Sequence, residues 1–122
     1  MENDEWIGYR IKIRDRLKTF ACNILELSSE FSDSPRSRVL NYQLTKAGTS
    51  TYANFRAALR GRSKAEFFSK LSISVEEADE AEMWLDLIIT TKLIDNERIK
   101  ILYAESLELV KMLSSLRKKI GN

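Results

Sequence analysis

The chain has 122 residues and a net charge of +2, and 43% of its residues are hydrophobic while 31% are charged. This length predicts a single domain spanning residues 1–122, and the high charge suits amphipathic helices better than an all-β sandwich. No run of eighteen apolar residues is present, which argues against a membrane-spanning helix, and the acidic start is unlike a signal peptide. The single cysteine, Cys22, cannot form an internal disulfide, which favours a cytoplasmic protein.

The small net charge conceals an uneven distribution along the chain. Residues 10–64 contain twelve basic and four acidic residues, whereas residues 65–86 contain one basic and seven acidic residues. Such blocks predict charged faces or ends on the folded molecule.

The first helix is predicted from about residue 4 to residue 29, with Asn3 or Asp4 as its N-cap. Its apolar residues recur at helical spacing and predict one buried stripe, made up of Trp6, Ile13, Leu17, Phe20, Ile24, Leu27 and Phe31.

The second helix is predicted over residues 35–59, because Ser34 can cap it and Pro35 fits its first position. Leu40 and Leu44 begin an apolar stripe that continues into a run of small and hydroxyl residues over positions 47–53. Glycine and β-branched threonine are poor helix formers, so we expect the run to permit close helix packing, with hydroxyls bonding back to the preceding turn.

The third helix is predicted over residues 64–91, opened by a capping box between Ser63 and Glu66. Gly61 is expected to end the preceding helix in a left-handed conformation. The fourth helix is predicted over residues 96–119 with Asp95 as its cap, and Gly121 lies just beyond its end.

Four helices joined by short loops predict an all-α fold, an antiparallel up-and-down four-helix bundle. Several apolar residues fall outside the main stripes, and a second apolar face predicts contact with another subunit. These residues are Ile7, Ile11, Ile73, Ile89, Leu107 and Val110.

Four segments in the central part of the chain share their order and spacing with a known family: Gln43–Ser50, Ala53–Ala57, Ser63–Phe67 with Lys70 and Leu71, and Glu77–Glu80 with Trp84 and Leu85. In these segments the chain resembles a bacterial family of small four-helix bundles, the 23S ribosomal RNA intervening-sequence proteins, which are distantly related to the accessory proteins of diversity-generating retroelements. One departure is Ala57, at a place where the family commonly carries a glutamate.

The resemblance implies a homopentamer shaped like a short barrel, with a basic surface, association with nucleic acid in several members and no established catalytic activity. The number five comes from the resemblance, since neither composition nor periodicity determines it. The chain has no histidine, which removes the commonest general base and metal ligand. No cofactor, metal or catalytic residue is therefore predicted.

Two other features carry alternative interpretations. Cys22 lies between Phe20 and Ile24, where a buried small hydrophobe is favoured over a reactive thiol. An acidic run could hold a hard cation, but a solvated face or a partner for lysines is favoured. The run comprises Glu76, Glu77, Asp79, Glu80, Glu82 and Asp86.

Asn54 and Glu80 both lie in segments that resemble the family. We predict a structural polar contact between them that fixes the register of the second and third helices.

In an up-and-down bundle the start of the first helix, the turn between the second and third, and the end of the fourth lie together. This end collects nine predicted nucleic-acid-binding cations: Arg10, Lys12, Arg56, Arg60, Arg62, Lys64, Arg117, Lys118 and Lys119. The alternative is ordinary solubility together with favourable charges at helix ends. No aromatic residues are interleaved with these cations in the sequence, so base stacking is not expected.

The sequence therefore predicts a non-enzymatic homo-oligomer that binds RNA or DNA non-specifically through a basic end, as an accessory or scaffold protein. The alternative is a protein–protein interaction module that recruits another protein through apolar faces. A hydrolase or metalloenzyme is disfavoured because no nucleophile–base pair is present.

Overall fold

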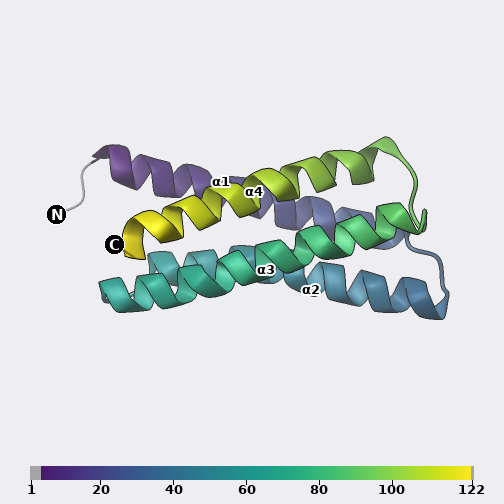
Figure 1. The fold of residues 1–122 in the computed structure, drawn as a ribbon, viewed down its shortest axis with the longest axis horizontal. Helices are drawn as coiled ribbons and strands as arrows, with labels where there is room; N and C mark the ends of the chain where they lie inside the picture. The colour runs from purple at the N-terminus through teal and green to yellow at the C-terminus, as the bar shows by residue number, and fades with distance from the viewer. Residues whose placement is uncertain (1–3, 122) are drawn as a thin grey trace.

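A computed structural model describes residues 4–121 and shows four long helices packed side by side (Figure 1). They are α1 (Asp4–Leu27), α2 (Pro35–Leu59), α3 (Lys64–Thr90) and α4 (Glu97–Gly121), and a short 3-10 turn, η1 (Ser28–Glu30), follows α1. Successive helices run in opposite directions, so the predicted antiparallel bundle is confirmed, and its helix limits differ from the predicted ones by at most two residues.

One continuous apolar core runs through the bundle and draws on all four helices. Its largest fully buried side chains include Phe20 and Leu17 from α1, Phe55 from α2, Leu85 from α3 and Leu109 from α4. Each predicted stripe contributes to this core, because residues three and four apart fall on the same face of a helix. Trp6 and Phe31, at the two ends of the first stripe, are only half-buried.

The small-residue run of α2 allows α1 to approach closely. Gly48 is buried, and a Cβ atom added there would lie 3.0 Å from Cγ1 of the fully buried Ile24 on α1. The hydroxyls of Thr49 and Thr51 donate to the carbonyls of Thr45 and Ala47, each at 2.8 Å. Both expectations for this run are therefore confirmed.

A buried hydrogen bond fixes how α2 and α3 align. The Ser74 hydroxyl donates to the Thr51 carbonyl at 2.7 Å, and both residues are fully buried. Because the helices are antiparallel, this bond places residue 51 opposite residue 74 and sets the register of every other pair. These two helices are the most extensively packed pair in the bundle.

The pair formed by α1 and α4 is packed much less extensively. It is spanned by an ion pair in which the Arg16 guanidinium donates to both carboxylate oxygens of Glu105, at 2.7 and 2.8 Å. At the start of α4, Nη1 of Arg98 lies 3.1 Å from Oε2 of Glu30 in η1, just after the end of α1.

The helix ends agree with the predicted caps in part. The Ser34 hydroxyl accepts from the Ser37 amide with Pro35 at the first helical position, as predicted. The α4 cap is Asn96 and not Asp95, because the Asn96 side chain accepts from the Ile99 amide at 3.0 Å. The predicted Asn3 cap of α1 lies outside the described residues.

The prediction of a left-handed Gly61 is wrong, since no glycine in residues 4–121 has a positive φ. A Cβ at Gly61 would instead lie 3.1 Å from both the Ala58 carbonyl oxygen and the Phe67 amide nitrogen. The residue is therefore small because backbone passes close by. The left-handed residue is Lys92, with φ of 56°, just after α3.

Lys92 ends α3 in a Schellman motif. The Leu93 amide donates to the Ile88 carbonyl at 3.1 Å, and the Lys92 amide donates to the Ile89 carbonyl at 3.0 Å.

The prediction that Cys22 is buried is also wrong, because its side chain is exposed. Phe20 and Ile24 are each two residues away, and two residues correspond to about 200° of helical rotation. Their burial therefore turns Cys22 toward solvent.

Within residues 4–121, no helix has the length and apolar character that crossing a membrane requires.

Candidate nucleic-acid interface

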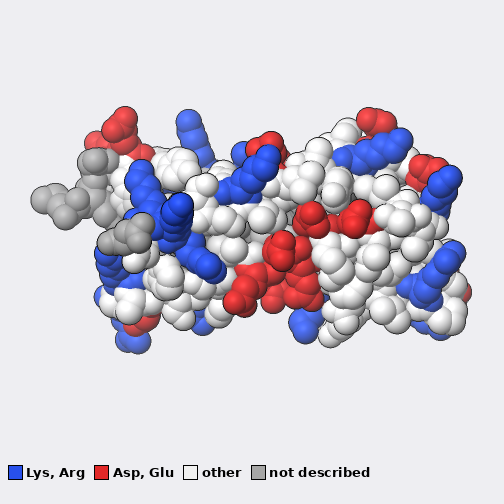
Figure 2. Space-filling view, in the orientation of Figure 1, with Lys and Arg blue, Asp and Glu red and all other residues white. Residues whose placement is uncertain are grey.

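The start of α1, the α2–α3 turn and the end of α4 meet at one end of the bundle (Figure 1). Figure 2 shows blue side chains gathered at this end and a red band across the middle of the same face. We call this the basic end and define it by the nine predicted cations. The predicted grouping at one end is thus present in the fold, because the helices alternate in direction.

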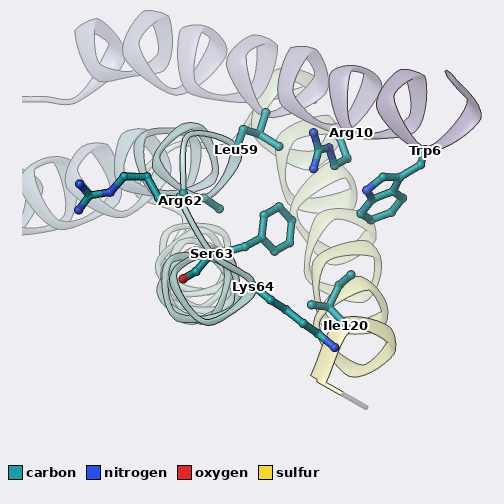
Figure 3. A pocket seen from close by; sticks show the side chains of 10 residues that line it. Trp6, Arg10, Leu59, Arg62, Ser63, Lys64 and Ile120 are labelled. Atoms are coloured by element: carbon teal, nitrogen blue, oxygen red, sulfur yellow. The ribbon is translucent and has the colours of Figure 1, made fainter. Parts of the chain in front are cut away.

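A cavity of about 520 Å³ opens at the basic end. Its lining comes from three parts of the chain: Trp6 and Arg10 of α1, the segment from Ala58 to Phe67 in part, and Ile120 of α4. In Figure 3 the Lys64 side chain extends toward Ile120, whereas the Arg62 side chain points away from Trp6 and Arg10. Three of the nine cations, Arg10, Arg62 and Lys64, therefore border one cavity, and their side chains point in different directions.

Arg10 is held between two aromatic rings in this cavity. Its guanidinium carbon lies 5.5 Å from the centre of the Trp6 ring and 5.9 Å from that of the Phe67 ring. Distances of this size are typical of cation–π contacts. The guanidinium is therefore positioned by the protein's own side chains.

The other two cations that border the cavity, Arg62 and Lys64, come from the α2–α3 turn and the start of α3. The Ser63 hydroxyl accepts from the Glu66 amide at 3.1 Å and begins α3, as predicted. The Glu66 carboxylate accepts from the Arg62 amide at 3.3 Å and lies 3.6 Å from Nε of Arg62. The reciprocal bond of the expected capping box therefore reaches the amide one residue before Ser63, and Arg62 is the cation that Glu66 partly neutralises.

Arg56 and Arg60 line a second, separate groove on the last two turns of α2, together with Tyr52 and Ala53. The Arg56 guanidinium carbon lies 5.7 Å from the centre of the Tyr52 ring.

The four remaining predicted cations line neither of these two openings. Lys118 and Lys119 are exposed in the last turn of α4, next to the half-buried Arg117. Lys12 is exposed on α1.

These contacts correct the expectation that no aromatic residues accompany the cations. Trp6 and Arg10 are four residues apart, as are Tyr52 and Arg56, and this spacing places side chains next to each other on a helix. That signal was present in the sequence and was missed. Phe67 comes from a different helix and could be placed beside Arg10 only by the fold.

The predicted contact between Asn54 and Glu80 does not form within the chain. The Asn54 side chain donates to the Ser50 carbonyl at 2.9 Å, and Glu80 accepts from the indole of Trp84 at 3.4 Å. The register set by Ser74 and Thr51 places Asn54 opposite residue 71, nine residues from Glu80. At about 1.5 Å per residue, that is a displacement of roughly 13 Å along the helix.

The acidic run lies in the second half of α3, over which Figure 2 shows red side chains. Four of its members are exposed, which agrees with a solvated face, while Glu77 and Glu82 are half-buried. Burial raises the pKa of Glu82, and the neighbouring Asp86 and Asp79 raise it further. Burial also raises the pKa of Glu77, with a smaller opposing effect of Lys46 on α2.

Within residues 4–121, no group of three or more histidine, cysteine, aspartate or glutamate side chains is arranged to hold a metal ion.

Comparison with known proteins adds two findings. Residues 10–115 match the family model described as 23S rRNA-intervening sequence protein. The chain is also similar to the crystal structure of a protein with unknown function from the S23 ribosomal protein family of Bacteroides thetaiotaomicron. The two are 34% identical with a TM-score of 0.81, over 89% of this chain and 97% of that one. No curated protein matches the chain.

Proposed function

Because the chain belongs to the family of 23S rRNA-intervening sequence proteins, we propose that it is a non-enzymatic accessory or scaffold protein that binds nucleic acid non-specifically. The basic end is the binding surface. The observation that carries this proposal is the cavity bordered by Arg10, Arg62 and Lys64, with the Arg56–Arg60 groove on the same end of the bundle.

Phosphate contacts explain why such a surface favours nucleic acid over small anions. Each cation that neutralises a phosphate releases condensed counterions, so affinity falls as salt concentration rises. If four cations contact phosphates, log K falls against log salt with a slope of about −3.6 for duplex DNA and about −2.8 for a single strand. Such contacts carry no direct sequence information, which is why the proposed binding is non-specific.

The experiment is a fluorescence anisotropy titration of labelled single-stranded and duplex oligonucleotides at several salt concentrations. The test variant replaces Arg60, Arg62 and Lys64 with alanine. The control variant replaces Lys92, Lys100 and Lys111, which are exposed and lie outside the basic end. Both variants lose three positive charges, so only the position of the charges differs.

We expect tight binding at low salt with a steep salt slope, a large loss in the test variant and a small loss in the control. Equal losses in the two variants would show that net charge, and not the basic end, drives binding. No binding at low salt by a folded protein would refute the proposal.

We also propose that the protein is a homo-oligomer. Ile7 and Ile11 are one turn apart on α1 and about two-fifths exposed, so a paired apolar patch faces outward. The family resemblance suggests a pentamer, and light scattering should then give about five times the 14.1 kDa chain mass.

The exposed Cys22 suits the reducing cytoplasm, where we place the protein.

A protein–protein interaction module is the second candidate function, favoured by other exposed apolar side chains. Val39 and Tyr42 on α2 and Ile101 on α4 are 57%, 64% and 62% exposed. Binding of a protein through these residues would change little with salt. That behaviour, together with an absence of oligonucleotide binding, would favour this candidate.

A further inference from the structure

We infer that the cavity at the basic end holds one unpaired nucleotide of a single-stranded nucleic acid, with its base stacked on Trp6 and its phosphate bound by Arg10 and Lys64. This inference rests on the proposed function and specifies the form of nucleic acid that the basic end prefers. It follows from the size of the cavity, its two kinds of lining and the placement of its cations.

The size of the cavity suits a small organic ligand. A volume of about 520 Å³ lies within the range of about 300 to 1,000 Å³ that is typical of ligand pockets. A base inside a duplex has both faces covered by its neighbours and cannot enter such a cavity. An unpaired base can, because both of its faces are available for stacking.

The apolar part of the lining matches the base. Trp6, Phe67 and Ile120 line the cavity, and all three are half-buried and packed against the core. Their inner sides are thus fixed by the bundle. Besides holding Arg10, the rings of Trp6 and Phe67 give the cavity an apolar surface against which a base can stack. Stacking of this kind tolerates every base, which agrees with non-specific binding.

The cationic part of the lining matches the phosphate. Arg10 is already positioned between the Trp6 and Phe67 rings, so little side-chain entropy is lost when it binds an anion. Lys64 reaches across the cavity from the start of α3 toward Ile120 (Figure 3). Apolar rings beside two cations reproduce the composition of a nucleotide, with an apolar base beside a charged phosphate.

Arg62 has a different place in this arrangement. Its side chain is 89% exposed, is partly neutralised by Glu66 and points away from Trp6 (Figure 3). We therefore expect Arg62 to contact flanking phosphates of either a single strand or a duplex, without distinguishing them.

Tryptophan fluorescence provides a direct readout, because the chain has only two tryptophans. Trp84→Phe leaves Trp6 as the single fluorophore, and Trp6→Phe leaves Trp84, which lies beside Glu80 near the C-terminal end of α3. An oligothymidine and a duplex of equal length are the probes. We expect the oligothymidine to quench Trp6 saturably, over the range in which anisotropy reports binding, and to leave Trp84 unquenched.

Affinity provides an independent readout. Trp6→Ala should weaken single-strand binding by about 5- to 150-fold, the effect of losing one stacked base, and change duplex binding less than about twofold. Trp6→Phe should retain most of the affinity, since it keeps a ring. Arg62→Ala should weaken both probes by similar factors. Circular dichroism of each variant verifies that the helices are intact.

Three results would overturn the inference. If the single strand and the duplex bind equally and Trp6 is not quenched, the stacking site is refuted while the proposed phosphate binding stands. If neither probe binds, both proposals fail. If a free mononucleotide quenches Trp6 as strongly as the oligothymidine at equal nucleotide concentration, the cavity is a site for free nucleotides and not for a strand.

Discussion

Two Gly→Ala substitutions, at Gly8 and Gly48, should change stability in opposite directions. Both glycines lie inside long helices, where alanine is the better helix former by about 0.8 to 1.0 kcal/mol. A Cβ at Gly8 meets nothing within 4 Å, so Gly8→Ala should stabilise the protein by nearly that full amount. Gly8 is therefore the matched control for Gly48.

At Gly48 the same gain is opposed by overpacking. The new methyl group would lie 3.0 Å from Cγ1, 3.2 Å from Cγ2 and 3.3 Å from Cβ of Ile24. Ile24 is fully buried, so it cannot move away without disturbing its neighbours. Inserting a methyl group into a well-packed core costs about 1 to 3 kcal/mol. We therefore expect Gly48→Ala to destabilise the protein by about 1 kcal/mol.

Urea unfolding followed by circular dichroism measures both effects. The protein concentration must be the same for all variants, because assembly would make the apparent stability depend on it. An unchanged m-value would show that only stability has changed. If Gly48→Ala stabilises the protein as much as Gly8→Ala, α1 and α2 are not in close contact at this point and the packing argument is refuted.

A double-mutant cycle separates overpacking from other causes. Ile24→Ala alone should cost about 2 to 5 kcal/mol, because it opens a cavity in the core. Combined with Gly48→Ala, the new methyl group enters that space, so the double variant should lose less stability than the two single losses added together. Additive losses would show that the two side chains do not meet.

Lys92→Gly should stabilise the protein by roughly 0.5 to 1 kcal/mol in the same urea assay, because glycine adopts the left-handed conformation without strain. Lys100→Gly, within α4, should instead destabilise it by about 1 kcal/mol, and a gain at both sites would contradict the reasoning. Glu82→Gln should raise the thermal midpoint at pH 7 but not at pH 3, since burial, Asp86 and Asp79 all raise the pKa of Glu82. Because the pKa is higher in the folded state, the carboxylate lowers stability as the pH rises above its ordinary value in the unfolded chain, and the loss is complete above the raised pKa. An equal rise of the midpoint at both pH values would show that charge is not the cause.

Helix positions could be predicted from the sequence because local signals agree with the fold. Ser34 and Ser63 both cap the helices that they were predicted to cap, and Pro35 occupies the first turn. The alternating direction of four such helices then accounts for the basic end. The family resemblance, drawn from the central segments, is confirmed by a family match that extends over residues 10–115.

The errors concern details that depend on rotation and register. The burial of Cys22 was predicted from its apolar neighbours Phe20 and Ile24. These residues are two positions away, and two positions along a helix lead to the opposite face. The prediction of a contact between Asn54 and Glu80 failed because it depends on the offset between α2 and α3. The Ser74–Thr51 hydrogen bond sets this offset, and no local sequence pattern reveals it.

The lining of the cavity at the basic end could be predicted from the sequence only in part. Its Trp6–Arg10 contact follows from four-residue spacing and could have been predicted. The contribution of Phe67 depends on how the start of α3 packs against α1, so it required the structure.

The unequal packing of the helix pairs determines the order in which the bundle should open. α2 and α3 are consecutive and joined by a short turn, so pairing them costs little loop-closure entropy. α1 and α4 are joined only through the rest of the chain, and their Arg16–Glu105 ion pair spans 89 positions. In native-state hydrogen exchange, we therefore expect the slowest amides in the α2–α3 hairpin. The seam between α1 and α4 should separate first, leaving that hairpin as the last folded unit of the molecule.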